Sequence, residues 1–320
     1  MFQLPLARAT FEAMEIGQTL GPVDLTVDDH EIKSYCFTTD DYHPWITTND
    51  SPFNARVAPA ALLVPQLLRL LNTRFDPNTE VGIHQKEEVW FHSPIFVGEK
   101  VRTSAIFVDK YVKRGFGYIV TEAEARAVSD GRLLVKHRCT EIAEVLPGTV
   151  LGSNGKAADT ATRRVSGLFS DDLPLVDRAA AETSVGSRML GQTKVIHQDQ
   201  MSVFSNVQAF WRSLHTDLDR ANQAGFRATI AQGLMQTMYA SELGTTFFGE
   251  SWFTAGWLSM SFLHPLYAGD SVTAKAVVVN RVSDRGTIVL EAEFWLENQD
   301  SVKTAVGWLR APIAKEGSRQ

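Results

Sequence analysis

The chain has 320 residues, of which 44% are hydrophobic and 21% are charged, and its formal net charge is −6. These proportions are those of an ordinary globular protein with room for about two domains. The acidic balance argues against a general nucleic-acid binder, which would need a basic face, and no apolar run reaches the roughly 18 residues of a membrane helix. The N-terminal segment also lacks the apolar core of a signal peptide. We therefore expect a cytoplasmic protein that binds neither nucleic acid nor membrane.

The cysteines and histidines show no metal-ligand pattern along the sequence. Cys36 and Cys139 are too far apart in the chain to form a ligand pair, and we expect both to be buried thiols. His84, His92 and His264 lie at the ends of predicted strands without partners at ligand spacing. The sequence therefore predicts no metal site and no bound cofactor.

An internal repeat covers most of the chain. Four pairs of identical residues recur at a spacing of 171: Phe91 and Phe262, Pro94 and Pro265, Gly98 and Gly269, Val101 and Val272. The dipeptide Arg114-Gly115 recurs as Arg285-Gly286 at the same spacing. Because these matches keep one order and one register, we interpret the chain as one structural unit used twice.

Each copy carries the same order of predicted elements. A helix is expected over Ala60–Asn72 in the first copy and over Ile230–Gly244 in the second, with Pro65 predicting a kink or a late helix start. Alternating apolar and polar residues indicate half-buried antiparallel strands over residues 101–112, 117–128, 133–142, 272–282, 287–297 and 303–313. One helix against an antiparallel sheet is an α+β layer, and we expect this layer twice.

The predicted units are residues 1–146 and residues 188–320. The linker between them, residues 147–187, is rich in Gly, Ala, Ser, Thr and Asp. Two similar units joined in this way should pack like the subunits of a two-fold dimer. A homodimer of whole chains is a further option.

The strongest functional candidate lies within residues 204–235. His215 precedes a polar helical turn that contains Asp217, and Gly225 then leads to the second central helix. Backbone N–H groups at a helix start can hold an acyl oxygen. A lone histidine is more often structural than catalytic, so the interpretation depends on the rest of the chain.

The segments Phe91–Val101, FHSPIFVGEKV, and Phe262–Val272, FLHPLYAGDSV, resemble a motif of the MaoC-like dehydratase family in its double hotdog form. That family includes (R)-specific enoyl-CoA hydratases. The resemblance implies two central helices, each wrapped by an antiparallel sheet, with the two sheets continuous. It also implies a non-catalytic N-terminal unit and a functional C-terminal unit.

The hydratase motif of the family pairs an aspartate with a histidine. Its histidine falls on His215, and four later motif positions fall on Asp217, Gly225, Gln232 and Gly233. The motif aspartate, however, falls on Phe210, and its asparagine falls on Arg212. Because the aspartate and histidine of the family hold one water between them for acid–base catalysis, the loss of the carboxylate should weaken ordinary hydration.

Three replacements for the carboxylate are open. Asp41 occupies the equivalent position in the first unit, which would make a composite site with His215. Asp217 or Asp219 could swing in, although carboxylates in helix turns more often cap the helix or face solvent. His215 could also act alone on a substrate with an acidic proton, as in an elimination or isomerisation.

The remaining motif positions predict a pocket. Phe210 and Trp211 would line it and favour an apolar or aromatic substrate. Arg212 would meet a carboxylate or a CoA phosphate, or would simply lie on the surface. Gln232 and the backbone at Gly233 would orient the carbonyl of the substrate.

The sequence therefore predicts a lyase that adds water to, or removes it from, an acyl-CoA-type thioester or a related conjugated carbonyl compound, with His215 as acid and base. The alternative is a non-catalytic hotdog protein that binds an acyl group or small molecule, or an inactive partner subunit of a hydratase. A thioesterase is a third option, and its carboxylate on the central helix would have to be Glu242.

Overall fold

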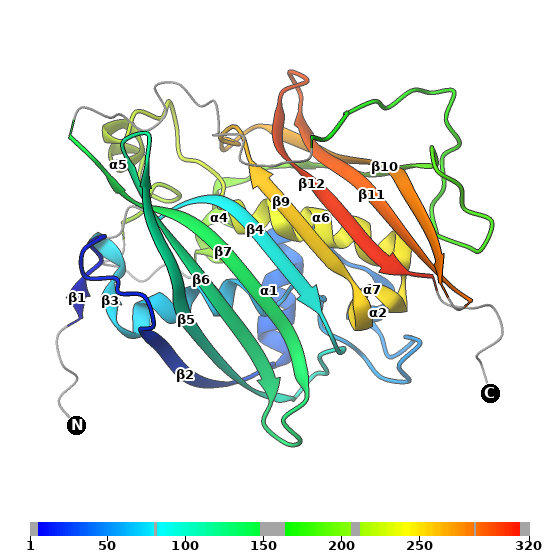
Figure 1. Cartoon of the computed structure of the whole chain (residues 1–320), viewed down its shortest axis with the longest axis horizontal. Coiled ribbons are helices and arrows are strands. Elements are labelled where there is room, and N and C mark those ends of the chain that lie inside the picture. The colour runs from blue at the N-terminus through cyan, green and yellow to red at the C-terminus, as the bar shows by residue number, and fades with distance from the viewer. Residues whose placement is uncertain (1–5, 80–81, 148–163, 206–211, 285, 314–320) are drawn as a thin grey trace.

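A single ten-stranded antiparallel sheet forms one face of the molecule, the face turned to the viewer in Figure 1. The computed structural model describes residues 6–79, 82–147, 164–205, 212–284 and 286–313. The strands of the sheet lie in the order β2-β5-β6-β7-β4-β9-β12-β11-β10-β8. Their bounds are Thr19–Thr26 for β2, Ile83–Phe91 for β4, Lys100–Lys113 for β5, Phe116–Ala127 for β6, Leu133–Val145 for β7, Arg188–Val195 for β8, Trp257–Phe262 for β9, Ser271–Asp284 for β10, Thr287–Asn298 for β11 and Lys303–Pro312 for β12.

The strand order is symmetric about the pair β4 and β9. On one side the strands run β7-β6-β5-β2, and on the other they run β12-β11-β10-β8. The two halves join where β4 pairs with β9 in an antiparallel register from Lys86↔Ser261 to Trp90↔Trp257. The two α+β layers predicted from the repeat, and the double hotdog form with one continuous sheet implied by the family resemblance, are confirmed.

Hairpin turns occur at equivalent positions in the two halves of the chain. Arg114 and Gly115 have φ angles of 53° and 81°, and Gly286 has a φ of 77°. Positive φ at both central residues is typical of the tight turn that matches the twist of paired strands. Arg114 and Gly115 therefore form the turn between β5 and β6, and Gly286 lies between β10 and β11.

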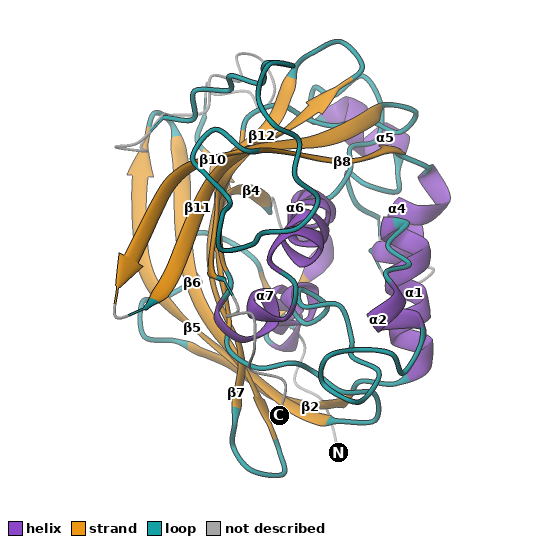
Figure 2. Cartoon of the chain, turned by 90° about the vertical axis from the view of Figure 1, so that its right-hand side faces the viewer, coloured by secondary structure: helices purple, strands orange, loops and turns teal. Residues whose placement is uncertain are grey.

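Helices fill the concave side of the sheet. Their bounds are Asp29–Thr39 for α1, Pro44–Thr47 for α2, Val64–Leu68 for α3, Gln198–Phe204 for α4, Leu218–Gln223 for α5, Gly233–Phe248 for α6 and Glu250–Ala255 for α7. Figure 2 shows α6 and α7 against the sheet, with α1, α2 and α4 in a layer outside them. The 16 residues of α6 are almost all buried, so this helix is the core of the C-terminal half.

The two central helices differ in length. The first is reduced to α3, which has five residues with Pro65 at its start, followed by a 3₁₀ turn over Arg69–Thr73. Proline suits the first turn of a helix because its missing N–H has no partner there. The late helix start predicted from Pro65 is therefore confirmed. The second helix, α6, begins at Gly233, slightly later than expected, because Gln232 has an extended backbone at the N-cap.

The described part of the linker passes from the sheet to the central helix: residues 166–169 contact β11, and the Ala179 amide donates to the Phe247 carbonyl of α6 at 2.8 Å. Ser166 donates its amide to Glu293 on β11 at 2.8 Å, and the Phe169 ring meets Trp295 edge-on at 6.0 Å. Residues 148–163 of the predicted linker lie outside the described residues, so we keep the domain boundaries as a proposal. None of the helices within the described residues is long and apolar enough to cross a bilayer.

Candidate active site

His215 lies in a turn that is fastened to the chain just before α6. Its amide donates to Ser213 Oγ at 3.2 Å, and its carbonyl accepts from Gln198 Nε2 at 2.8 Å. The neighbouring Leu214 carbonyl accepts from the Ile230 amide at 3.1 Å. These bonds hold the turn against the segment that leads into the central helix, as the motif spacing predicts.

The imidazole of His215 is fixed in one tautomer. Its Nδ1 lies 2.8 Å from the Ile230 carbonyl oxygen. A carbonyl oxygen only accepts, so Nδ1 carries the hydrogen and Nε2 keeps its lone pair. Burial lowers the pKa of His215 to about 4, although the bond to Ile230 opposes this shift, and the charge of His84 lowers the pKa further. The ring is therefore a neutral base at physiological pH.

The start of α6 supplies hydrogen-bond donors beside this base. The first N–H groups of a helix have no acceptor within it, and the positive end of the helix dipole lies there. Gln232 does not cap the helix; instead its Nε2 donates to the Met201 carbonyl at 2.9 Å and to Ser205 Oγ. The Gln232 side chain thus ties α6 to α4 instead of accepting from the first-turn amides, of which that of Met235 donates to the Gln232 carbonyl at 3.0 Å.

A histidine of the N-terminal half stands against the same helix start. A Cβ placed on Gly233 would lie 2.9 Å from His84 Cβ and 3.2 Å from Phe262 Cζ. Only glycine fits this close approach between α6 and β4. The His84 ring also meets the Phe262 ring edge-on at 5.6 Å. The two halves of the chain therefore meet at the start of α6, with His215 from one half and His84 from the other.

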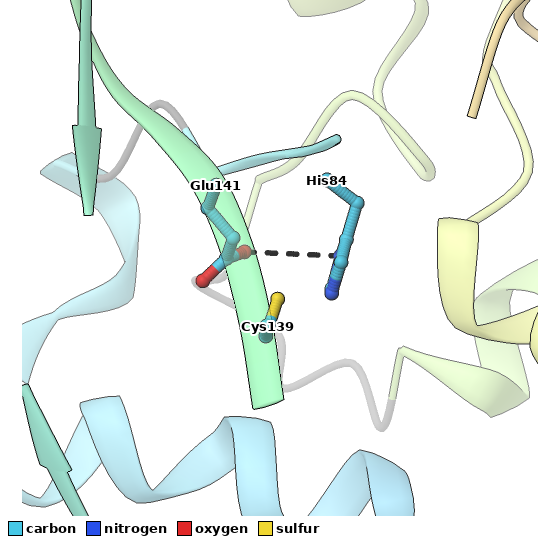
Figure 3. A group of neighbouring side chains, drawn as sticks. All are labelled: His84, Cys139 and Glu141. Atoms are coloured by element: carbon cyan, nitrogen blue, oxygen red, sulfur yellow. Dashed lines mark ion pairs between the residues drawn. The ribbon is translucent and has the colours of Figure 1, made fainter. Parts of the chain in front are cut away.

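Behind His84 lies a buried polar cluster on β4 and β7 (Figure 3). Glu87 is fully buried, with His137 Nε2 2.5 Å from Oε1 and His84 Nε2 3.2 Å from Oε2. Burial alone would raise the pKa of Glu87, but the charge and hydrogen bond of His137, aided by His84, bring it down to about 2. Glu141 lies with its Oε1 3.8 Å from His84 Nδ1, and burial raises its pKa.

The sequence predicts no partner for His84 at ligand spacing, but the structure places two carboxylates beside its ring. Glu87 is three residues later on β4, and Glu141 is on β7, more than fifty residues later in the chain, where spacing in the sequence does not reveal it. A weaker signal is present in β7 itself. His137, Cys139 and Glu141 occupy every second position of the strand, in step with Val135 and Ala143. The side chains of these residues therefore point to the same face of the sheet, and this face is buried in the core. Cys36 and Cys139 are both buried free thiols, as expected.

Asp41 lies at the other end of the central helix from His215. It is buried just after α1. Its carboxylate accepts a hydrogen bond from the His43 amide at 3.2 Å, and the positive charge of Lys194 acts on it. Lys194 binds Glu242, the tenth residue of α6, at 2.7 Å. At a rise of 1.5 Å per residue, Glu242 is about 14 Å along the helix from Gly233. The structure thus does not bring Asp41 to His215, which leaves the composite site without geometric support.

The residues predicted around His215 have structural roles. Asp217 caps α5 by accepting from the Arg220 amide at 3.1 Å, and it also forms an ion pair with Arg212. The Arg212 side chain is 62% exposed, so Arg212 lies on the surface. Gly225 ends α5 with a φ of 90°, which favours glycine. Phe210 and Trp211 lie outside the described residues.

A comparison with protein families bears on this geometry. The sequence model described as "MaoC like domain" matches residues 180–297, which include His215 and the whole of α6. The C-terminal half is thus similar to a MaoC-like domain. The resemblance expected from the sequence motifs is therefore confirmed. No curated protein shows significant similarity to the chain.

Solved structures extend the likeness of the MaoC-like domain to the whole fold. A MaoC-like dehydratase shares 14% identity at a TM-score of 0.70, covering 95% of this chain and 100% of its own. A MaoC-like dehydratase from Phytophthora capsici shares 13% identity at a TM-score of 0.64, with 97% and 100% covered. A double hotdog protein from Mycobacterium tuberculosis shares 13% identity at a TM-score of 0.63, with 95% and 97% covered. These identities are low, so the likeness concerns the fold.

Proposed function

We propose that the chain is a hydro-lyase that adds water to, or removes it from, an acyl thioester or a related conjugated carbonyl compound. The single observation that carries the proposal is the bond between His215 Nδ1 and the Ile230 carbonyl. This bond leaves Nε2 as the basic nitrogen of a ring that is attached to the chain three residues before α6 begins at Gly233. The match of this segment to a MaoC-like domain supports the assignment to this class of reaction.

The proposed mechanism uses His215 as the only proton carrier of the motif. In the elimination direction, Nε2 removes the proton from the carbon next to the thioester carbonyl. The electron pair moves toward the carbonyl oxygen, where the amides of the first α6 turn stabilise the developing negative charge. The imidazolium then returns its proton to the departing hydroxyl as water leaves. Hydration is the reverse sequence.

The change of the motif aspartate to Phe210 favours a substrate whose α-proton is already acidic. A base and an oxyanion site are sufficient for such a substrate, without a second carboxylate to orient the water. We propose that CoA or a similar thiol serves as the handle of the substrate, with no resident cofactor. We also propose that the protein acts in the cytoplasm.

A non-catalytic binder is the second candidate, and the loss of the motif carboxylate at Phe210 favours it. The thioesterase option gains no support, because Glu242 is engaged by Lys194 at 2.7 Å, far along α6 from His215.

Comparing turnover by the His215→Ala variant and by the wild type distinguishes a hydro-lyase from a non-catalytic binder. Short-chain, long-chain and aromatic enoyl thioesters would be screened by the loss of their conjugated absorbance. We expect the substitution to lower kcat about a hundred- to ten-thousand-fold on any substrate that the wild type turns over. The matched control is His264→Ala, which changes an exposed histidine outside the site. Equal turnover by the wild type and His215→Ala would overturn the catalytic proposal, and binding without any turnover would favour the binder.

A further inference from the structure

The buried cluster behind His84 is not required by the fold, because the second half of the chain builds the same place without it. In the first half, Val89 pairs with His137 and Glu87 pairs with Cys139. At the equivalent register of the second half, Met260 pairs with Gly307 and Leu258 pairs with Leu309.

Glu87, His137 and Cys139 thus correspond to Leu258, Gly307 and Leu309. Buried ionic groups are often no more stabilising than apolar residues of similar volume. Since apolar packing suffices in the second half, the polar set of the first half calls for a functional explanation.

Three side chains of the cluster converge on one point. His84, Cys139 and Glu141 each offer a ligand atom, and these atoms all lie within 4.8 Å of one another. The His84 Nδ1 and Glu141 Oε1 atoms are 3.8 Å apart, which is too long for a hydrogen bond. Figure 3 shows the sulfur of Cys139 pointing into the space between the other two side chains.

The spacing of these atoms suits the ligands of one ion. Bonds of about 2.0–2.3 Å to nitrogen, oxygen and sulfur in tetrahedral geometry separate the ligand atoms by roughly 3.3–3.8 Å. Small side-chain rotations would bring three atoms within 4.8 Å to that separation. Imidazole, thiolate and carboxylate together form a borderline-soft donor set, which favours zinc among the common divalent ions.

The groups around this point have the arrangement of an outer ligand shell. The second nitrogen of His84, Nε2, lies 3.2 Å from Glu87 Oε2, as in sites where a carboxylate orients a metal-bound histidine. Glu87 is held in turn by His137 at 2.5 Å. Within the described residues, His137 Nδ1 has no hydrogen-bond partner although the side chain is only 1% exposed.

A bound cation would also suit the charge of the cluster. Glu87 is already paired with His137 at 2.5 Å, whereas the carboxylate of Glu141 is costly to ionise in the interior without a counter-charge. A divalent ion would neutralise Glu141 and the Cys139 thiolate together.

We propose that His84 Nδ1, Cys139 Sγ and Glu141 bind one divalent transition-metal ion, of which zinc fits best, with Glu87 orienting His84. The protein would supply three ligands from β4 and β7, and a fourth position would be left for water or another small ligand. The site faces the start of α6 through His84. The proposal does not depend on the hydro-lyase assignment, because metal binding can be measured without turnover.

The test is metal analysis of the full-length protein. The purified chain is treated with a chelator, incubated with zinc and passed through a desalting column, and the retained metal is measured by mass spectrometry. We expect one equivalent of zinc per chain and a higher Tm with zinc than without it. With cobalt(II) as the probe, we expect a thiolate-to-cobalt charge-transfer band together with the strong visible bands of tetrahedral cobalt.

Two substitutions sharpen the test. Cys139→Ser should lose the charge-transfer band, whereas Cys36→Ser, which changes the other buried thiol, should keep it. Glu87→Gln should keep the band but weaken zinc affinity about 10- to 100-fold, as expected for an outer-shell carboxylate. A wild-type chain that retains no zinc and shows no thiolate band with cobalt would overturn the proposal, whether or not the variants fold. Unchanged zinc affinity in a folded Cys139→Ser variant would also overturn it.

Discussion

The neutral imidazole of His215 makes a prediction about pH and rate. Burial lowers its pKa to about 4 in the folded chain, against about 6.5 for an exposed histidine. If Nε2 is the base, kcat/KM should stay constant as the pH falls from 7 to 5 and decline only toward pH 4. The check is a pH–rate profile with the best thioester found, and a decline centred near pH 6.5 would contradict the role of this buried ring.

The same histidine also links stability to pH. Between about pH 6.5 and pH 4 the unfolded chain binds a proton at this position and the folded chain does not, so stability is lost as the pH falls through this window. From the shift to about 4, the loss at pH 5 relative to pH 7 should be at most about 2 kcal/mol. Urea unfolding at both pH values measures it. His215→Gln should show a smaller loss than the wild type, and an equal loss in both would show that other groups carry the effect.

At the scale of elements, the contact between β4 and α6 depends on Gly233. An alanine there would press against His84 Cβ at 2.9 Å and Phe262 at 3.2 Å. Because His84 Cβ is attached directly to the backbone of β4 and cannot turn away, we expect Gly233→Ala to destabilise the chain by about 1–3 kcal/mol. Urea unfolding checks this prediction. The substitution should cost less in a His84→Gly background, where the opposing Cβ is absent, and an equal cost there would refute the steric explanation.

The elements were the most predictable part of the structure. Alternation along the sequence placed the strands that became β5, β6 and β11 to within a residue or two at each end. The alternation is clearest in β5, which has one buried and one more exposed face, whereas the middle of β11 is buried on both faces. The helix at Pro65 was predicted less well. Apolar residues from Ala60 onward are buried as a helix would bury them, but only the five residues Val64–Leu68 form α3. The core requires apolar side chains at these positions whether or not the backbone is helical.

The site was predicted only where it is continuous in the sequence. His215, Gln232 and Gly233 lie on one stretch of chain, so motif spacing located them. His84 and Glu141 became neighbours only through the β4–β7 register. No local pattern encodes that register, since it depends on how the sheet closes around α6. Asp41 was predicted as a partner of His215 because it occupies the equivalent of the motif aspartate in the first repeat. Equivalent positions of two repeats related by a pseudo-two-fold axis do not have to lie close together.

At the scale of the whole molecule, the sheet is unbroken across the two halves and one apolar core contains residues of both. Unfolding of either half would therefore expose part of the apolar core of the other half. We predict a single cooperative thermal transition in scanning calorimetry, with equal calorimetric and van't Hoff enthalpies. Two resolved transitions would show that the junction between β4 and β9 is too weak to couple the halves.

The pairing of β4 with β9 also bears on how such a protein can change during evolution. In a dimer of identical chains, every substitution occurs on both sides of the axis, so a residue that helps one side must be tolerated by the other. Fusion of the two copies removes that condition. Here the long α6 and the turn that carries His215 lie in one half, while Glu87 and Cys139 lie in the other, opposite the apolar Leu258 and Leu309 at the equivalent positions. Under the two proposals made above, a single chain divides between its halves two kinds of chemistry that a dimer of identical chains would have to place twice in the same core.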